Sequence, residues 1–176
     1  VITDSEFSAS EIRAAYSLPD SLVNVIPLGV DQVFTRGDES ESSVLPHSVT
    51  LLYVLHVGDL QERRNLSMLV DALLAARKHL HNFPLLSLVL VGSDRGIAKE
   101  LNVTDEWSNT SPPVIHFDTV NEKQLLALYK QAAMLAYPSF YEGFGLPVLE
   151  AMACGTPVVA SHAASMPEVL GDAGIL

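Results

Sequence analysis

Two glutamates flank a glycine-containing junction in the second half of the chain. Glu142 stands just before Gly143 and Gly145, and Glu150 follows the junction. An apolar run precedes it and a helix-like segment follows, so the free N–H groups of a first helical turn and the helix dipole would favour a phosphate there. The glycines let the backbone approach such a ligand closely. Carboxylates accept hydrogen bonds from vicinal hydroxyls, so the two glutamates could hold a sugar and a ribose around that phosphate.

The same junction also fits a simpler interpretation. A glycine turn that joins a strand to a helix needs the same residue types. In that case Glu142 would lie in solvent, and Glu150 would be an ordinary carboxylate favoured by the helix dipole near the helix start. The residues of the junction do not by themselves decide between a ligand site and a structural turn.

A second polar cluster follows an earlier apolar run. It begins at Gly58 and Asp59 and continues through Glu62 to the adjacent Arg63 and Arg64. Guanidinium groups match phosphate geometry and stay charged, so this pair could hold a diphosphate. Open parallel sheets bind ligands at the carboxyl ends of their strands, which favours this interpretation over a pair of ordinary surface arginines.

Two further turns follow apolar runs, at residues 92–94 and 118–120. Thr119 and Val120 lie in the second of them. Both turns could line the same crevice as the arginines. Serine and aspartate after a strand are nevertheless ordinary turn residues, so a purely structural role is the favoured interpretation for both turns.

The hydropathy pattern predicts the elements that would position these residues. From residue 50 onward, apolar runs alternate with longer amphipathic stretches, which is typical of an α/β fold with a parallel sheet and crossover helices. Strands are expected at residues 51–57, 86–91, 114–117, 134–137 and 157–160. Helices are expected from near Asn65 to Leu80, over 122–133 and over 147–154.

A brief helix is expected after the last of these strands. Ser165 followed three residues later by Glu168 matches a capping box, in which each side chain bonds the backbone of the other residue. Gly171 would end this helix. We therefore expect Ser165 and Glu168 to act locally, on the helix that they open.

The first 48 residues differ from the rest. A short helix is expected over 8–15 and a short strand over 24–28, whereas residues 31–48 show no clear period. Within that last segment, residues 37–43 are acidic and serine-rich, which is typical of a solvated, mobile loop. We therefore expect a linker region there.

Composition limits the classes of function. The chain has 21 acidic and 10 basic residues, a net charge of -11, which argues against a nucleic-acid or anionic-membrane partner. No apolar run approaches the roughly 18 residues of a membrane span, and no leader pattern opens the chain. The single cysteine, Cys154, fits a reducing compartment. The six histidines show no metal spacing, and neither a G-x-G-x-x-G fingerprint nor a P-loop is present.

The segments taken together resemble a known family. Residues 142–147 with 150–160 resemble the signature of the group 1 retaining glycosyltransferases, which have two facing Rossmann-like domains in the GT-B fold. The match includes the family's pair of glutamates separated by seven residues. Further resembling pieces lie at residues 26–31, 63–65 and 167–171, so that the resemblance covers nearly the whole chain.

The resemblance implies a domain organisation. In this family the second domain binds the nucleotide-sugar donor, and the piece at 26–31 marks the crossing from the acceptor domain. Residues 1–30 are then expected to be a remnant of the acceptor domain with that crossing, and 31–48 a linker or mobile loop. Residues 49–176 would be the donor-binding Rossmann-like domain, with helices on both faces of its parallel sheet and truncated at its C-terminus.

The resemblance also implies roles for individual residues. Arg64 and Glu142 are the expected catalytic residues: Arg64 would neutralise the diphosphate leaving group, and Glu142 would contact the transferred sugar. Glu150 would contact the ribose, and the backbone of residues 143–146 the sugar or diphosphate. The full expected donor site consists of Gly58, Asp59, Arg63, Arg64, Thr119, Val120, Glu142, Gly143, Phe144, Gly145, Leu146 and Glu150.

Four positions depart from the family pattern. Arg64 stands where the family usually has lysine, Asp59 where many members have arginine, Glu62 where many have proline, and Asp118 where glycine is frequent. The acids at 59 and 62 add negative charge near the expected phosphates. The departure at Asp59 weakens the case for one phosphate contact, which Arg63 or Arg64 could supply instead.

The leading hypothesis is an enzyme that transfers a hexose, such as mannose, from a nucleotide-diphosphate sugar to a glycan or lipid-linked acceptor. The resemblance implies retention of configuration and no metal or other cofactor. It also implies a cytoplasmic enzyme, which could associate with a membrane in its full-length form. The alternatives are a non-catalytic relative with a structural or regulatory role and a simple nucleotide-binding module. Because the acceptor half is missing, the chain alone is expected to bind donor weakly and not to turn it over.

Overall fold

The computed structural model describes residues 1–35, 45, 49, 52–79, 86–97, 99, 101 and 114–176. The acidic run predicted as a loop at residues 37–43 lies outside these residues, as does Leu80, the last apolar position of the first predicted long helix. Most of the segments expected to carry the site fall within the described part of the chain.

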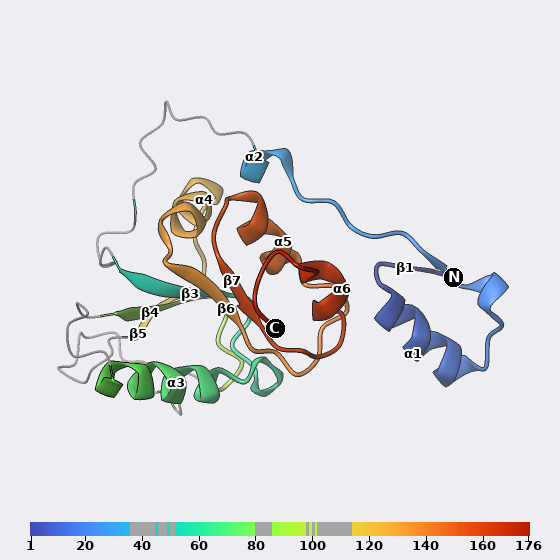
Figure 1. Cartoon of the computed structure of the whole chain (residues 1–176), viewed down its shortest axis with the longest axis horizontal. Helices are drawn as coiled ribbons and strands as arrows, with labels where there is room; N and C mark the ends of the chain where they lie inside the picture. Colours follow the sequence, from blue (N-terminus) through green and yellow to red (C-terminus); the bar gives the residue numbers. More distant parts are fainter. Residues whose placement is uncertain are drawn as a thin grey trace.

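A five-stranded parallel sheet forms the centre of the fold, with strand order β5-β4-β3-β6-β7 (Figure 1). Its strands are β3 (Tyr53–Val57), β4 (Ser87–Val91), β5 (Val114–Phe117), β6 (Met134–Tyr137) and β7 (Val158–Ala160). The chain leaves β3 in one direction and returns to its other side with β6, so the strand order reverses between them. Such a reversal is where open α/β sheets bind ligands.

Helices cover both faces of this sheet because successive strand residues point to opposite sides. On one face, α3 (Leu66–His79) packs Leu66, Leu69 and Leu73 against the strands. On the other face lie α4 (Glu122–Gln131) and α5 (Leu146–Ala153), which share a core with residues of β3, β4 and β6. Burying each such leucine contributes about 1.5–3 kcal/mol, so both faces stabilise the sheet. The predicted α/β architecture with helices on both faces is confirmed.

Helix α5 begins one residue earlier than expected, at Leu146, because of the backbone at Gly145. Gly145 has φ 110° and ψ 51°, a conformation that residues with a side chain rarely adopt. A Cβ added to Gly145 would also lie 2.4 Å from Cε of Met166. Both the turn and the close approach of the next helix therefore require glycine at this position.

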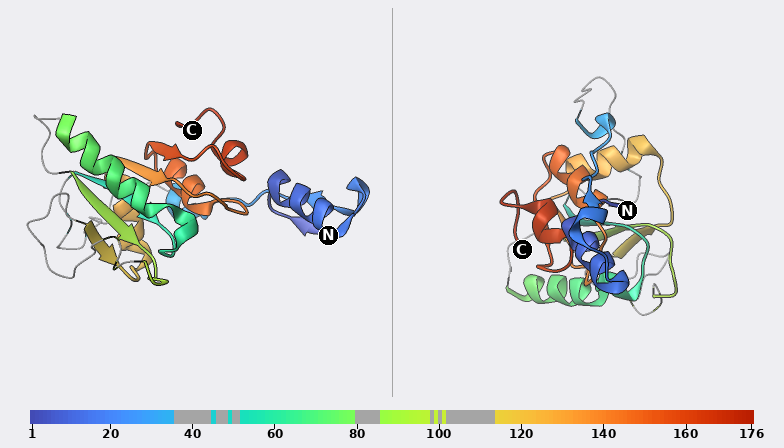
Figure 2. Two further views of the ribbon diagram at one scale, coloured as in Figure 1. Left: turned by 90° about the horizontal axis from the view of Figure 1, so that it is seen from below. Right: turned by 90° about the vertical axis from the view of Figure 1, so that its right-hand side faces the viewer.

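The first 25 residues form a small unit of their own, which we call the N-terminal unit. It contains β1 (Ile2–Thr3), α1 (Glu6–Tyr16), the 3-10 turn η1 (Asp20–Leu22) and β2 (Asn24–Val25), with β1 and β2 paired in parallel. Figure 2 shows this unit projecting from the larger body beside the C-terminal helix α6 (Met166–Leu170). The strand expected over 24–28 is shorter because β1 offers only two residues for pairing.

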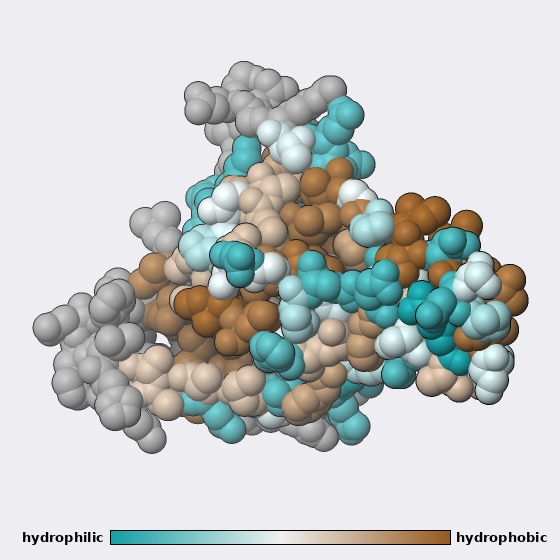
Figure 3. Space-filling view, turned by 45° about the vertical axis from the view of Figure 1, so that its right-hand side comes forward, coloured by the Kyte–Doolittle hydropathy of each residue, from teal (hydrophilic) through white to brown (hydrophobic). Residues whose placement is uncertain are grey.

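The N-terminal unit exposes apolar side chains. Val1, Ile2, Tyr16 and Leu22 are each more than half exposed. Part of this surface is visible as brown patches on the unit in Figure 3. Exposed apolar patches mark interaction surfaces. The origin of residues 1–30 in an acceptor domain stays a prediction.

The segment predicted as a linker begins with a helical turn, α2 (Gln32–Thr35). Phe34 in this turn is buried and lies edge-on to Tyr129 of α4, with ring centroids 5.7 Å apart. The large apolar surface of one aromatic side chain is sufficient to fix a short turn against the core. The start of the expected linker is therefore part of the packed structure.

The capping box predicted at the start of α6 is wrong. Ser165 has the backbone conformation of a helical residue, φ -77° and ψ -7°, and its side chain makes no capping bond. Its hydroxyl instead donates to the carbonyls of Glu142 and Phe144, 3.0 and 2.7 Å away. Glu168 accepts bonds from the backbone of α1. Both side chains act on distant segments, because buried carbonyls and a helix end there need partners.

Candidate functional site

The two polar clusters predicted from sequence meet at the carboxyl ends of β3 and β6. After β3 the chain makes the 3-10 turn η2 (Glu62–Arg64), and after β6 a loop leads into α5. Arg63 Nη1 lies 2.8 Å from Glu142 Oε1, and Arg64 Nη1 contacts the same carboxylate oxygen. The N–H of Phe140 donates to the carbonyl of Arg63 at 2.9 Å, which ties the loop to the turn.

The guanidinium of Arg64 lies close against the backbone at Gly58. Only 8% of Arg64 is exposed, and a Cβ added to Gly58 would lie 3.0 Å from Cζ of the arginine. Glycine at position 58 therefore leaves room for the guanidinium above the end of β3. On its other side, Arg64 Nη1 donates to the hydroxyl of Tyr137, and Cζ lies 5.1 Å from the ring centroid as a cation–π contact.

The charges at this junction leave an excess of positive charge. Two guanidinium groups surround one carboxylate, and Glu142 is only 7% exposed. Both guanidinium groups contact the same oxygen, Oε1, of this buried carboxylate. Within the described part of the chain, Nε of Arg64 is buried without a hydrogen-bond partner. The junction can therefore accept a further anion.

Two residues of this network were missed by the sequence reasoning. His56 is fully buried, stacks on Tyr137 at 5.4 Å, and bonds the carbonyl of Ala136 through Nδ1 at 3.0 Å. Burial lowers the pKa of His56 to about 4 and raises the pKa of Tyr137 to about 12, so both are neutral near pH 7. The available signal was a histidine and a tyrosine near the carboxyl ends of two apolar strands.

The loop after β6, residues 141–145, presents backbone donors. Among the hydrogen bonds formed between described residues, none uses the N–H of Gly143, Phe144 or Gly145 as its donor. The carbonyl of Gly145 accepts the first bonds of α5, from Val148 and Leu149, so the positive end of the helix dipole lies at the same place. This loop can bind an anion without using a side-chain charge.

Glu150 has a partner of its own, apart from the arginines. Its Oε2 accepts a 2.7 Å bond from the hydroxyl of Tyr129 on α4. Burial raises the pKa of Glu150, and the bond from Tyr129 opposes this rise. The structure therefore shows Glu142 and Glu150 in different environments, the first paired with cations and the second with a neutral hydroxyl.

Asp59 pairs with an arginine that the sequence reasoning did not single out. Arg95 follows the turn after β4, and its Nε and Nη2 each lie 3.0 Å from Oδ2 of Asp59. The hydrogen bond from Arg95 lowers the pKa of Asp59 below its usual value. The acid at position 59 is thus paired with Arg95 across the ends of the two strands.

Thr119 and Val120 lie after β5, on the far side of β4 from β3. Thr119 is exposed, and Val120 is partly buried against the apolar core. His116 Nε2 lies 2.7 Å from the carbonyl of Gly92, which links the turn after β5 to the turn after β4. Within the part of the chain that the structure describes, no hydrogen bond or ion pair joins Thr119 or Val120 to Arg63, Arg64 or Glu142.

Most of the chain matches one protein family. Residues 52–176 match the family model described as glycosyl transferases group 1. The chain belongs to this family. It is 32% identical to O-antigen chain mannosyltransferase B of Escherichia coli over 183 residues, covering 100% of the chain and 46% of that relative. It is 30% identical to MMP alpha-(1->4)-mannosyltransferase of Mycolicibacterium hassiacum, covering 99% of the chain and 39% of that protein.

The chain thus spans less than half the length of these group 1 relatives. Among solved structures, it resembles S. aureus TarM, crystallised with UDP among its ligands, at a TM-score of 0.73 and 17% identity. The alignment covers 100% of the chain and 33% of TarM, and at this identity it shows the fold alone. The resemblance stated from the sequence and the fold that it implied are both confirmed.

The structure places the expected donor-site residues of this group 1 chain in three groups. Gly58, Arg63, Arg64 and Glu142 meet at one junction, which continues into the loop from Gly143 to Leu146. Asp59 and Glu150 lie nearby with separate partners. Thr119 and Val120 lie beyond β4. Across the described residues, no group of three or more acidic, histidine or cysteine side chains could hold a metal, and no helix is long and apolar enough to cross a membrane.

Proposed function

We propose that this chain supplies the donor-binding half of a retaining hexosyltransferase. The enzyme would transfer a hexose, such as mannose, from a nucleotide-diphosphate sugar to a glycan or lipid-linked acceptor. The observation that carries the proposal is the meeting of Arg63, Arg64 and Glu142 beside the free N–H groups of the loop after β6. Two relatives that cover nearly all of the chain are named mannosyltransferases, which supports the same class of reaction.

The diphosphate of the donor would bind between the arginine turn after β3 and the loop after β6. The N–H groups of residues 143–145 would donate to phosphate oxygens, and the two guanidiniums would supply charge. Glu142 holds both arginines in the unbound structure, so the phosphates and the carboxylate would share these cations when donor is present. An oxygen of Glu142 would then be available to accept from a hydroxyl of the sugar. Glu150 is proposed to bind the ribose.

Transfer would break the bond between the anomeric carbon and the diphosphate oxygen. A new bond forms between that carbon and the acceptor hydroxyl oxygen, the hydroxyl proton passes to the solvent, and the nucleoside diphosphate leaves with the electron pair of the broken bond. Negative charge grows on the diphosphate in the transition state, and a fixed cation there stabilises it more than the ground state. Arg64 fits this role because its guanidinium is held by Tyr137 and Glu142. The proposal invokes no metal or other cofactor for this step.

The compartment and the acceptor belong to the same proposal. A single cysteine fits the reducing cytoplasm. The net charge of -11 makes nucleic acid an unsuitable partner, since it would repel the phosphate backbone. A lipid-linked acceptor would bring the full-length enzyme to a membrane, and the acceptor would be bound outside residues 49–176.

Titration calorimetry of this chain against nucleotide-diphosphate sugars and the matching free nucleoside diphosphates tests the proposal. Arg64→Ala should weaken binding of both ligand classes, whereas Glu142→Ala should reduce mainly the gain that the sugar provides. Arg64→Lys keeps a cation at the same place and should retain part of the binding. Lys130→Ala, at the exposed end of α4, removes the same charge away from the junction and serves as the control. Binding that ignored Arg64→Ala would contradict the proposed site.

A further inference from the structure

Serine hydroxyls bond three consecutive carbonyls, those of residues 142–144, in the loop after β6, which we call the donor loop. The single hydroxyl proton of Ser165 is shared between the carbonyls of Glu142 and Phe144 on one side of the loop. Ser5 and Ser8 donate to the carbonyl between them, that of Gly143. Ser165 opens α6 of the larger body, whereas Ser5 and Ser8 belong to the N-terminal unit. The loop is therefore supported from two separate parts of the molecule.

These bonds determine where the loop directs its N–H groups. A trans peptide is planar, so its C=O and the N–H of the following residue point in opposite directions. Drawing the carbonyl of Gly143 toward α1 turns the N–H of Phe144 away from α1. The bonds from Ser165 orient the N–H groups of Gly143 and Gly145 in the same manner. These three N–H groups are the donors that lack an acceptor among the described residues.

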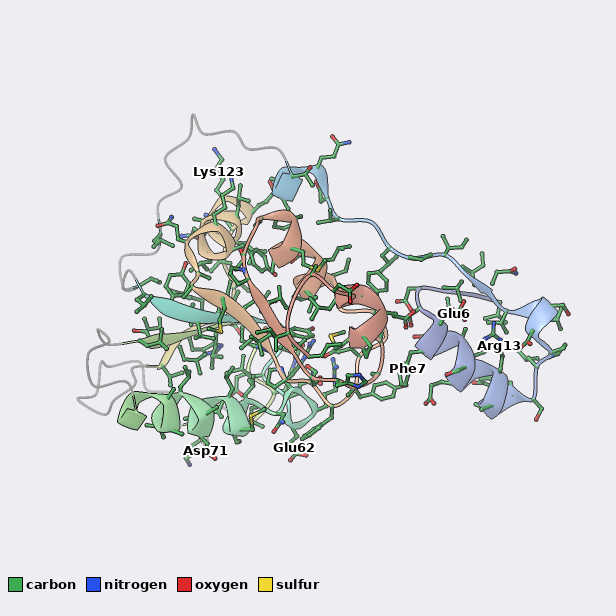
Figure 4. All side chains as sticks on the ribbon, viewed as in Figure 1. Glu6, Phe7, Arg13, Glu62, Asp71 and Lys123 are labelled. Atoms are coloured by element: carbon green, nitrogen blue, oxygen red, sulfur yellow. The ribbon has the colours of Figure 1, made fainter. Side chains whose placement is uncertain are left out.

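Glu168 seats the N-terminal unit against the larger body. Its Oε2 and Oε1 accept bonds from the N–H groups of Glu6 and Phe7, at 2.8 and 3.0 Å. The first N–H groups of a helix have no partner within the helix, and a carboxylate there also interacts favourably with the dipole. The ring of Phe7 lies edge-on to Tyr141, with centroids 5.3 Å apart. Figure 4 shows Phe7 on the side of α1 that faces the larger body.

We propose that Ser5 and Ser8, seated by Glu168, are positioning residues of the donor loop, so that affinity for a nucleotide-diphosphate sugar depends on docking of the N-terminal unit. This inference rests on the proposed function of the loop. The coupling is reciprocal: donor that binds the oriented N–H groups would in turn favour the docked unit. A contact between α1 and α6 thereby becomes part of donor recognition, although neither helix supplies a ligand to the donor.

Ser8 offers the sharpest test, because its side chain can be removed without removing the helix cap at Ser5. Ser8→Ala should shift the amide resonances of Phe144 and Gly145 and weaken binding of GDP-mannose or UDP-glucose about three- to tenfold, the effect of one lost hydrogen bond. Ser8→Thr keeps the hydroxyl and should restore both. Ser10→Ala is the matched control, since the hydroxyl of Ser10 bonds only Phe7 of the same helix among the described residues. It should leave the loop resonances and the affinity unchanged.

Glu168→Ala tests the seating step. It should remove the protection of the Glu6 and Phe7 amides from hydrogen exchange and reproduce the effect of Ser8→Ala on the loop. Glu11→Ala, an exposed acid on α1, loses the same charge and should do neither. Equal affinity of the unchanged chain and Ser8→Ala for the two sugar nucleotides would overturn the inference and leave the proposed function intact. If the unchanged chain binds neither probe, the proposed function and the coupling both fail. If Ser8→Ala leaves the amide resonances of the loop unmoved, Ser8 does not position the loop and the inference also fails.

Discussion

The two junctions at the centre of the site use different chemistry. After β3, the chain offers side chains: Arg63 and Arg64 bring charge, and Gly58 only makes room. After β6, the chain offers backbone N–H groups, and their direction is set by hydroxyls of Ser5, Ser8 and Ser165. A side-chain junction can be removed by one substitution within it. A backbone junction can be altered only through its glycines or through the residues that hold its carbonyls.

The largest expected effect is on the side-chain junction. In an enzyme assembled with its acceptor domain, Arg64→Ala should lower kcat about 10²- to 10³-fold, as the loss of one charge-stabilising group does at other active sites. Steady-state kinetics with a nucleotide-diphosphate sugar measures this, with Lys130→Ala as the control. Arg64→Lys should recover part of kcat, because the charge returns without the planar contacts to Tyr137. If circular dichroism showed that Arg64→Ala is unfolded, the fall in kcat would not be evidence for a catalytic role of Arg64.

The backbone junction should respond to Gly145→Ala. The substitution forces an alanine into φ 110° and sets its Cβ 2.4 Å from Cε of Met166, so we expect a loss of roughly 1–3 kcal/mol in the free energy of unfolding. Urea denaturation measures the loss. Gly145→Ala combined with Met166→Ala relieves the contact and not the backbone strain. If the double variant were fully as stable as Met166→Ala alone, the backbone conformation would not be what requires glycine.

The difference between the junctions also explains what the sequence could predict. The charged turn at residues 62–64 and the glycines at 143 and 145 could be predicted from their residue types, and the sheet could be predicted from the apolar runs. The supports of the loop did not, because Ser5 lies 138 positions from Gly143 and nothing local marks the pair. Ser165 and Glu168 showed a local pattern that led to the wrong partner, since distant carbonyls and a helix end competed for them.

Buried members of the network escaped prediction for a related reason. His56 and Tyr137 sit inside strands, where an isolated polar residue has many possible partners. Their value becomes visible only when the strand order places β3 beside β6. The same holds for Arg95, which reaches Asp59 because β4 lies beside β3 and both strands end at the same edge of the sheet. Strand adjacency, which a single sequence does not encode locally, was the missing information.

Glu150 should give a smaller effect that depends on pH. Burial raises the pKa of Glu150 in the folded chain above its usual value of 4.5, so the folded state binds this proton more readily than the unfolded state. The contribution of Glu150 to stability should therefore fall as pH rises from 4.5 through the raised pKa. Glu150→Gln keeps an acceptor for Tyr129 and removes the titration. Its stability relative to the unchanged chain should rise over that interval in urea denaturation, and a constant difference would contradict the assigned environment.

The smallest effect is expected at the pair between Asp59 and Arg95, beside the charged junction. The hydrogen bond from Arg95 lowers the pKa of Asp59, so the pair should stabilise the fold at neutral pH and lose its effect as pH falls through the lowered pKa. Both partners are exposed enough for solvent and salt to screen them, so Asp59→Asn should change Tm little at pH 7 and not at all at strongly acidic pH. The same substitution tests whether Asp59 contacts the donor. Asp59→Asn frees Arg95 and removes an acid near the diphosphate. Calorimetry should therefore show equal or tighter binding of a nucleoside diphosphate. Weaker binding would mean that the carboxylate itself contacts the donor, and the turn after β3 would then bind through an acid as well as through its arginines.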